Sequence, residues 1–270
     1  MSSPKSNSID RVTTAWKEHW EKSDVRPDAS WKGSLLRRYV ARFGGFSSNR
    51  YILHNVLLKH LNDVRGKSVL DAGAGTGLNS LPLSLRGADV TLLDIAPRAL
   101  EIASTYYAEL GLTARCVPGS IFEMPFPDRS FDIVWNTGVI EHFEPVDRRR
   151  ALHEMLRVMK PSGVLLTVNP NANARIYRFA KERAERSGTW DVGVEYPIAG
   201  LAPDVDHQKY ELLEEEAGFL MQLHFLKYLL PKALRFPYVA LHEGVQSLVN
   251  NLNRYPGYLR VSVIRQRAPG

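Results

Sequence analysis

A run of glycines at the end of an apolar segment is the feature of this sequence most directly tied to chemistry. The segment 68–70 leads into Asp71, and Gly73, Gly75 and Gly77 follow at intervals of two. Where a strand turns into a helix, glycines let a ligand touch the backbone because no Cβ blocks the approach. The Asp71 carboxylate among those N–H groups would repel a pyrophosphate, but it can accept hydrogen bonds from a cationic or hydroxyl-bearing ligand. We therefore expect that the ligand is not a dinucleotide.

The spacing of the glycines supports the same conclusion. A dinucleotide fingerprint needs its third glycine three positions after the second, and Leu78 stands there. The pattern Asp-x-Gly-x-Gly-x-Gly instead resembles the first motif of the class I S-adenosylmethionine-dependent methyltransferases. A second acidic residue, Asp94, ends the apolar run 90–93. It lies roughly 20 residues beyond the glycines, about where an acidic residue meets a ribose diol.

Three later segments extend the resemblance. They are Gly119 to Phe122, Ser130 to Asn136, and Leu156 to Gly163 with the apolar strand behind it. Ser120 departs from the family, which usually has an acidic residue there to hold the adenine amino group. The resemblance implies S-adenosylmethionine as cofactor and no metal. It also implies a set of cofactor-binding residues: Asp71, Ala72, Gly73, Gly75, Gly77, Asp94, Ile95, Ser120, Ile121, Asn136 and Thr137.

The order of elements predicts an α/β fold. Apolar strands alternate with helical stripes from residue 67 to 169, which indicates a parallel sheet with right-handed crossovers and helices on both faces. The resemblance extends this to a Rossmann-like, seven-stranded, mostly parallel sheet. We expect a single domain, 1–270. It comprises an N-terminal helical cap (1–66), a cofactor-binding core (67–169) and a substrate-side region (170–270) with a helical insertion, 229–257, before the last strand.

Three segments outside the core allow further predictions. Residues 10–65 read as helical, and they either cap the cofactor cleft or merely cover the sheet. The stretch 211–219 is interpreted as the last helix and its turn into strand six, and 259–264 as strand seven. Within 229–257 one amphipathic stripe consists of Leu241, Val245, Leu248, Val249 and Leu252. We favour packing of this stripe against the chain itself, with a homodimer contact and an acyl or membrane contact as alternatives.

Composition excludes several classes of function. The chain has 270 residues and a net charge of +6, but its basic residues alternate with acidic ones, as in 181–186, which is typical of a solvated helix face. Base-modifying relatives carry an Asn/Asp-Pro-Pro-aromatic motif where this chain has 136–139, so we expect no nucleic-acid partner. The single cysteine precludes an internal disulfide, and no apolar run is long enough to cross a membrane. We expect a cytoplasmic protein with a small-molecule substrate and no integral membrane association.

The function that the resemblance implies is methyl transfer to a small molecule. We predict a hydroxyl acceptor in a natural product, quinone or saccharide, with N-methylation of a small amine or a non-catalytic cofactor-binding scaffold as alternatives. His142 follows strand four and is the predicted catalytic base, although a Glu-His pair can simply fix the following helix. Arg175 and Arg178 could clamp an anionic substrate. Further candidates in variable loops are Tyr177, Glu195, Tyr196, His207 and Tyr210.

Overall fold

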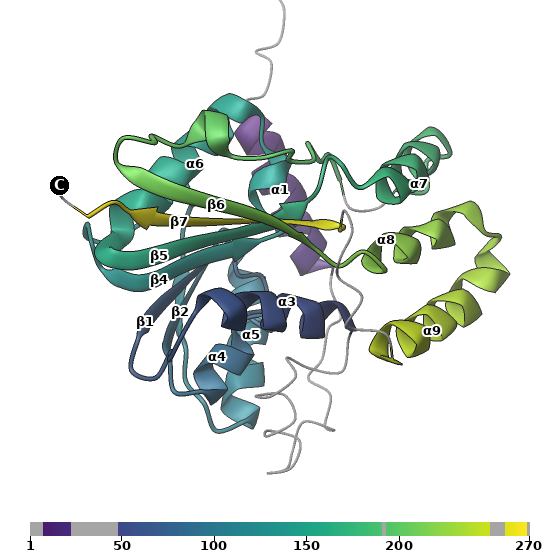
Figure 1. Cartoon of the computed structure of the whole chain (residues 1–270). Helices are drawn as coiled ribbons and strands as arrows, with labels where there is room; N and C mark the ends of the chain where they lie inside the picture. The colour runs from purple at the N-terminus through teal and green to yellow at the C-terminus, as the bar shows by residue number, and fades with distance from the viewer. Residues whose placement is uncertain (1–7, 23–47, 191–192, 249–256, 269–270) are drawn as a thin grey trace, which may run out of the picture.

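The structure is a computed structural model, which describes residues 8–22, 48–190, 193–248 and 257–268. Its centre is one sheet of seven strands in the order β3-β2-β1-β4-β5-β7-β6 (Figure 1). β7 runs antiparallel to β5 and β6, and the remaining pairs are parallel. The strands are β1 (Ser68–Ala72), β2 (Asp89–Asp94), β3 (Arg115–Pro118), β4 (Phe131–Thr137), β5 (Met159–Pro170), β6 (Tyr210–Ala217) and β7 (Leu259–Gln266). The predicted fold class is therefore confirmed.

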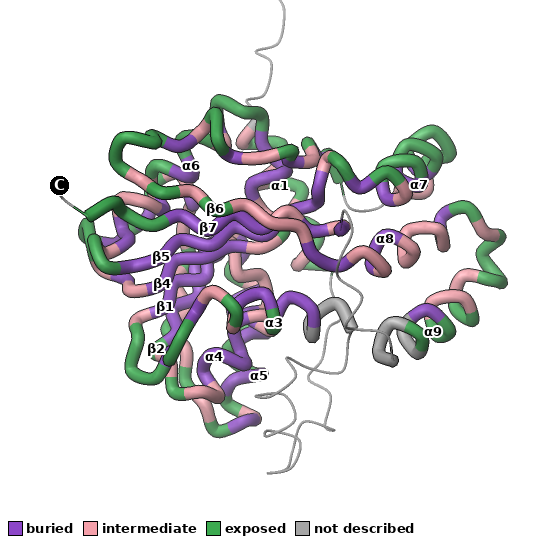
Figure 2. Tube along the Cα trace, in the orientation of Figure 1, coloured by how far each residue is buried: buried purple, intermediate pink, exposed green. Residues whose placement is uncertain are grey.

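Helices cover both faces of this sheet, because successive strand residues point to opposite sides. On one face Val69, Leu92 and Trp135 pack against α3 (Ser48–His60), α4 (Leu81–Leu85) and α5 (Pro97–Glu109). On the other face Leu70 and Val134 pack against α6 (Pro145–Val158), with α1 (Ser8–Glu21) at its margin. Figure 2 shows the central strands as the buried part of the molecule.

A third group of helices lies beyond the edge at which the parallel strands end. It consists of α7 (Arg175–Arg186), α8 (Met221–His224) and α9 (Lys232–Leu248), with the 3-10 helix η4 (Phe225–Leu229) between α8 and α9 (Figure 1). Two further 3-10 helices are η2 (Ile140–His142) and η3 (Ala202–Asp204). None of the helices in the described ranges combines the length and apolar character needed to cross a bilayer.

The interpretation of 211–219 as a helix was wrong, because these residues form β6. A run of glutamates favours a helix locally, but here Glu214 and Glu216 find partners on the neighbouring strand β7 and Glu215 pairs with Lys59 and His60 of α3. Glu214 Oε1 accepts from Ser262 Oγ at 3.0 Å and from the Leu201 amide at 2.8 Å. Glu216 pairs with Arg260 at 2.9 Å on β7. Strand preference depends on such cross-strand pairs more than on intrinsic propensity, so tertiary context decided the conformation.

The helical insertion before the last strand is present as α8, η4 and α9, but its apolar stripe does not pack as favoured. Leu241 is 68% exposed and Val245 is 46% exposed, so self-packing is wrong for these two residues. Val249 and Leu252 lie outside the described residues, as do the N-terminal positions Trp31, Leu35, Leu36, Tyr39 and Phe43. Of the predicted N-terminal helices, α1 and α3 are described, and they lie on opposite faces of the sheet.

Candidate functional site

A cavity of about 260 Å³ lies where β1 to β4 end at their carboxyl edge, which is where α/β sheets bind ligands. Nine of the twelve predicted site residues line it: Asp71, Gly73, Gly75, Asp94, Ile95, Ser120, Ile121, Thr137 and His142. Ala72, Gly77 and Asn136 are not among its lining residues. Most of the polar groups that the sequence motifs placed at strand ends are thus brought together.

The glycine loop needs glycine at two positions that face the cavity. Gly73 has a φ of +84° and Gly75 a φ of +52°, a region that other residues rarely adopt. A Cβ on Gly73 would lie 2.7 Å from Val139 Cγ2, and one on Gly75 would lie 3.1 Å from Trp20 Cζ2. Side chains here would therefore fill the space in which backbone can meet a ligand. Gly77 instead faces Leu92 inside the protein, where a Cβ would lie 2.5 Å from Cδ1.

Asp71 is a nearly inaccessible carboxyl group at the floor of the cavity. Its Oδ2 accepts a hydrogen bond from Ser80 Oγ at 2.7 Å, and Ser80 Oγ accepts one from Trp135 Nε1 at 3.0 Å. Burial, and to a smaller extent the nearby Asp94 carboxylate, raise its pKa to about 7 in spite of the Ser80 bond. Such a group is ready to pair with a cationic ligand group, because pairing would restore its charged form.

Asp94 fastens the glycine loop to the start of α5. Its Oδ2 accepts from the Gly75 amide at 2.7 Å, and its Oδ1 accepts from the Ala96 amide at 2.9 Å. Burial raises its pKa, and these N–H bonds oppose that rise. Asp94 therefore shapes the loop as well as facing the cavity.

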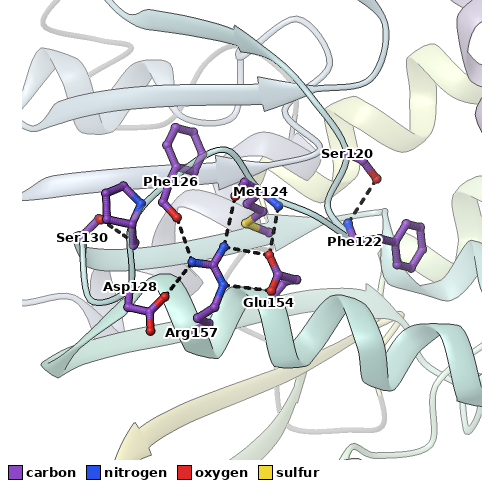
Figure 3. A network of polar contacts seen from close by, with 9 residues as sticks. Ser120, Phe122, Met124, Phe126, Asp128, Ser130, Glu154 and Arg157 are labelled. Atoms are coloured by element: carbon purple, nitrogen blue, oxygen red, sulfur yellow. Dashed lines mark hydrogen bonds and ion pairs between the residues drawn. The ribbon is translucent and has the colours of Figure 1, made fainter.

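The wall formed by Ser120 and Ile121 belongs to a segment that Arg157 holds against α6. The Arg157 guanidinium donates to Glu154 Oε1 at 2.9 Å and to the Phe126 carbonyl at 2.8 Å, and it pairs with Asp128 at 2.8 Å. Figure 3 shows these groups converging on one side chain. Hydrogen bonds from Arg157 lower the pKa of Glu154, so the pair stays charged. Arg157 lies within the segment Leu156 to Gly163, but Phe126 and Asp128 stand 31 and 29 positions earlier in the chain, so the motif gave no sign of this anchor.

His142 ends the 3-10 helix η2 and lines the cavity. Its Nδ1 lies 2.7 Å from the Val194 carbonyl oxygen. A carbonyl only accepts, so Nδ1 carries the proton and Nε2 is left as the nitrogen that can take one up. Burial lowers the pKa of His142, which keeps the ring neutral at ordinary pH. The backbone thus fixes the tautomer of His142 and leaves Nε2 unprotonated.

Comparison with known proteins identifies the central part of the chain. Residues 70–167 match a family model described as "Methyltransferase domain". These residues therefore form a methyltransferase domain, in agreement with the resemblance that the motifs show. A ubiquinone biosynthesis O-methyltransferase of Rickettsia felis is 32% identical over 127 residues, which are 47% of this chain and 50% of that protein. The match thus spans about half the length of that curated relative. A demethylmenaquinone methyltransferase of Tropheryma whipplei is 29% identical over 200 residues, 70% of this chain and 78% of that protein.

Solved structures agree on the fold alone. The PH0226 protein of Pyrococcus horikoshii has a TM-score of 0.57 at 19% identity, covering 93% of this chain and 99% of its own. The [4+2]-cyclase SpnF has a TM-score of 0.55, also at 19% identity, covering 100% and 99%. A cyclase on the same fold shows that the architecture does not determine the reaction, so the reaction has to be inferred from the residues of the site.

The cavity has a second wall that the sequence motifs did not specify. Val12, Thr13, Trp16 and Trp20 of α1 all line it. The Trp16 ring meets the His142 ring edge to face at 5.2 Å between centroids. α1 therefore caps the cavity, whereas α3 only covers the sheet, so both alternatives for the N-terminal region hold for different helices. Trp16 and Trp20 lie in the segment predicted to be helical, but nothing in the sequence places them over the glycine loop.

Asn136 occupies a different place from the one expected. Its side chain is fully buried, and Nδ2 donates to Met155 Sδ at 3.2 Å, toward α6. Its Oδ1 has no hydrogen-bond partner among the described residues. The next residue, Thr137, is the one at the end of β4 that reaches the cavity.

Behind His142 lies a buried acidic cluster, which the sequence did not reveal as a unit. Glu141, His142 and Glu195 offer three ligand atoms within 4.8 Å of one another. Tyr177 donates its hydroxyl to Glu195, and Glu141 Oε2 has no partner among the described residues. Burial raises the pKa of both carboxyl groups, that of Glu141 strongly. A divalent cation could be held only after both had ionised, so the raised pKa values favour protonated carboxyls here.

The remaining candidates in variable loops do not reach the cavity. Arg175 and Arg178 are exposed on α7, and Arg178 lies 3.8 Å from Glu182, as on a solvated helix face. Tyr196 and His207 are also exposed. The anion clamp therefore has no support in the geometry.

Proposed function

We propose that this enzyme transfers a methyl group from S-adenosylmethionine to a hydroxyl oxygen of a small aromatic acceptor. The observation that carries the proposal is His142, a neutral base in the cavity wall with Nδ1 tied to the Val194 carbonyl. A hydroxyl acceptor has a proton to lose, and such a base is placed to take it.

The other cavity residues suit the cofactor. In this proposal the backbone at Gly73 and Gly75 meets the methionine part, and Asp71 pairs with its ammonium group. Asp94 receives the ribose hydroxyls, and Ser120 and Ile121 flank the adenine. The support is geometric: two glycines that a Cβ would block line one cavity with two buried carboxyl groups.

Positioning supplies most of the catalysis in this proposal. S-adenosylmethionine carries its methyl group on a sulfonium, whose leaving group needs no acid to depart. Holding two reactants at near-attack distance can supply ~7 to 11 kcal/mol. The cap formed by Trp16 and Trp20 restricts water and orients the acceptor, while His142 Nε2 takes the acceptor proton.

The proton chemistry favours an aromatic hydroxyl over a sugar hydroxyl. A phenol has a pKa of about 10, so a neutral imidazole can deprotonate it as transfer proceeds, whereas an aliphatic alcohol is far less acidic. The apolar side chains Val12, Trp16, Phe122, Val139 and Phe143 also line the cavity. They fit a flat, apolar ring. The names of the two relatives refer to quinones, whose reduced forms are aromatic diols, and the first of these names specifies O-methylation.

The proposal is tested with His142→Ala and a panel of catechols, hydroquinones and small amines. We expect turnover on hydroxyl acceptors to fall by roughly 10²-fold or more, with S-adenosylmethionine affinity near wild type. The control is His153→Ala, since His153 is exposed on α6. Product is followed by mass spectrometry, and cofactor binding by calorimetric titration.

Each outcome has a definite meaning. An unchanged rate and an unchanged pH profile, followed down to about pH 5 because burial lowers the pKa of His142, would show that His142 only fixes η2. Methylation of amines with no loss in the variant would replace O-methylation by N-methylation, because a neutral amine needs no base. Binding of S-adenosylmethionine without methylation of any acceptor would favour the non-catalytic scaffold, and failure to bind it at all would refute both the enzyme and that scaffold.

A further inference from the structure

Helix α9 presents apolar side chains to solvent and polar ones to the protein. Tyr238 donates its hydroxyl to the Leu223 carbonyl at 2.6 Å, and His242 Nε2 lies 2.9 Å from the Leu220 carbonyl oxygen. Both partners belong to the α8 region, which defines the inner face of α9. The usual arrangement of a surface helix is the opposite, with charged residues outward.

The outer face is almost entirely apolar. Among the α9 side chains that the structure describes, Lys232 is the one polar residue that is exposed. The large apolar ones are Phe236, 83% exposed, Leu241, 68%, Leu234, 53%, and Val245, 46%. Soluble domains rarely leave a contiguous apolar face of this kind uncovered unless it binds something.

The charge around this face narrows the choice of occupant. Within the segment 229–245, Lys232 and Arg235 outnumber the one acidic residue, Glu243, and Lys227 lies just before it. A second copy paired about a two-fold axis would bring this excess of positive charge against its own counterpart. An anionic bilayer would satisfy both features, since it accepts apolar side chains and attracts lysine and arginine.

We propose that α9 docks this enzyme on the surface of anionic membranes, with the segment 229–245 lying in the headgroup region. α9 lies beyond the same sheet edge at which the cavity opens between strand ends (Figure 1). Docking would therefore bring the cavity toward a lipophilic acceptor. The docking itself does not depend on the proposed O-methylation, and binding alone tests it.

The experiment is cosedimentation of the full chain with extruded vesicles of phosphatidylcholine, with or without about 30% phosphatidylglycerol. We expect binding to the anionic vesicles that weakens as salt rises. The double variant Phe236→Gln/Leu241→Gln should bind at least about tenfold more weakly, because it removes the two most exposed apolar side chains of the helix. Lys232→Glu should also weaken binding. The matched control is Phe179→Gln on α7, at a residue that is 61% exposed, and it should bind like wild type.

Three results would overturn the proposal. A dimer in analytical ultracentrifugation that the double variant dissociates, without vesicle binding, would make a second copy the occupant. A melting temperature of the double variant several degrees below that of Phe179→Gln would show that the chain itself covers the face. Equal binding to neutral and anionic vesicles would refute the preference for anionic lipid, and no binding to either would refute membrane docking.

Discussion

The substitution Asp71→Asn removes a buried carboxyl group, and the structure predicts that it stabilises the folded chain at high pH. The folded chain holds the Asp71 proton to about pH 7, against an ordinary pKa of 3.8. Between these values the folded state binds more protons than the unfolded state, so stability falls as pH rises from about 4 to about 7. At 1.36 kcal/mol per pKa unit, the loss at pH 8 is at most about 4 kcal/mol.

Asparagine removes this loss without removing the hydrogen bond. Its amide oxygen can still accept from Ser80 Oγ, which lies 2.7 Å from Asp71 Oδ2. We therefore expect the variant, free of cofactor, to melt several degrees above wild type at pH 8 and close to it at pH 5. We expect the reverse for cofactor affinity. Losing a charged partner for the ammonium group should weaken S-adenosylmethionine binding by ~1.5 to 3 kcal/mol.

The assay is thermal unfolding from pH 5 to 8, with calorimetric titration of the cofactor in two buffers of different ionisation enthalpy. Wild type should release a proton on binding near pH 6, and the variant should not. Asp132→Asn is the control, because its pKa shift is opposite to that of Asp71. Hydrogen bonds from Lys160 and Ser68 lower the Asp132 pKa to about 2, against the effect of burial. It should destabilise at pH 7, with the difference disappearing as pH falls toward 2. Parallel stability curves for wild type and Asp71→Asn would refute the reasoning.

Two further substitutions test the loop between β1 and α4. Asp94→Ala should weaken S-adenosylmethionine by ~1.5 to 3 kcal/mol. It should also lower the melting temperature, because the Gly75 and Ala96 amides lose their hydrogen-bond acceptor. Unchanged cofactor affinity in calorimetric titration would contradict a role of Asp94 in ribose binding. Gly75→Val should abolish measurable cofactor binding. The control is Gly66→Val, which should bind normally, because Gly66 has a similar φ of +67° but nothing lies within 4 Å of the added Cβ. Equal binding by both variants would mean that the Gly75 loop is only structural.

The grouping of Asp71, Gly73, Gly75 and Asp94 around one cavity could be predicted because each of its parts is encoded locally. A strand that ends in Asp71 and turns through glycine needs only its own residues to place backbone N–H groups at the sheet edge. Asp94 ends the neighbouring strand in register, with Ala72 opposite Leu93. The strand ends therefore converge in space without help from distant segments. The misplaced Asn136 shows the limit of this logic, because alternation along β4 sends adjacent side chains to opposite faces.

The glutamates of β6 were misread because local propensity and tertiary pairing disagree there. Glu214 and Glu216 satisfy their charges through Ser262 and Arg260, partners more than forty positions away in the chain. No window of sequence contains both halves of such a pair. The same reason hid the Arg157 anchor and the acidic cluster of Glu141 and Glu195.

The acceptor side is unreadable from the sequence because distant segments build it, and this explains why the chemistry is clearer than the substrate. Trp16 reaches the cavity from α1, and the carbonyl that fixes the His142 tautomer belongs to Val194, in a connection before β6. Neither lies in a family motif. Methyl transfer needs only an aligned nucleophile and a base, so these segments can vary freely while the cofactor loop does not. Substitutions at Trp16 should therefore change which acceptors are methylated more than how tightly the cofactor binds.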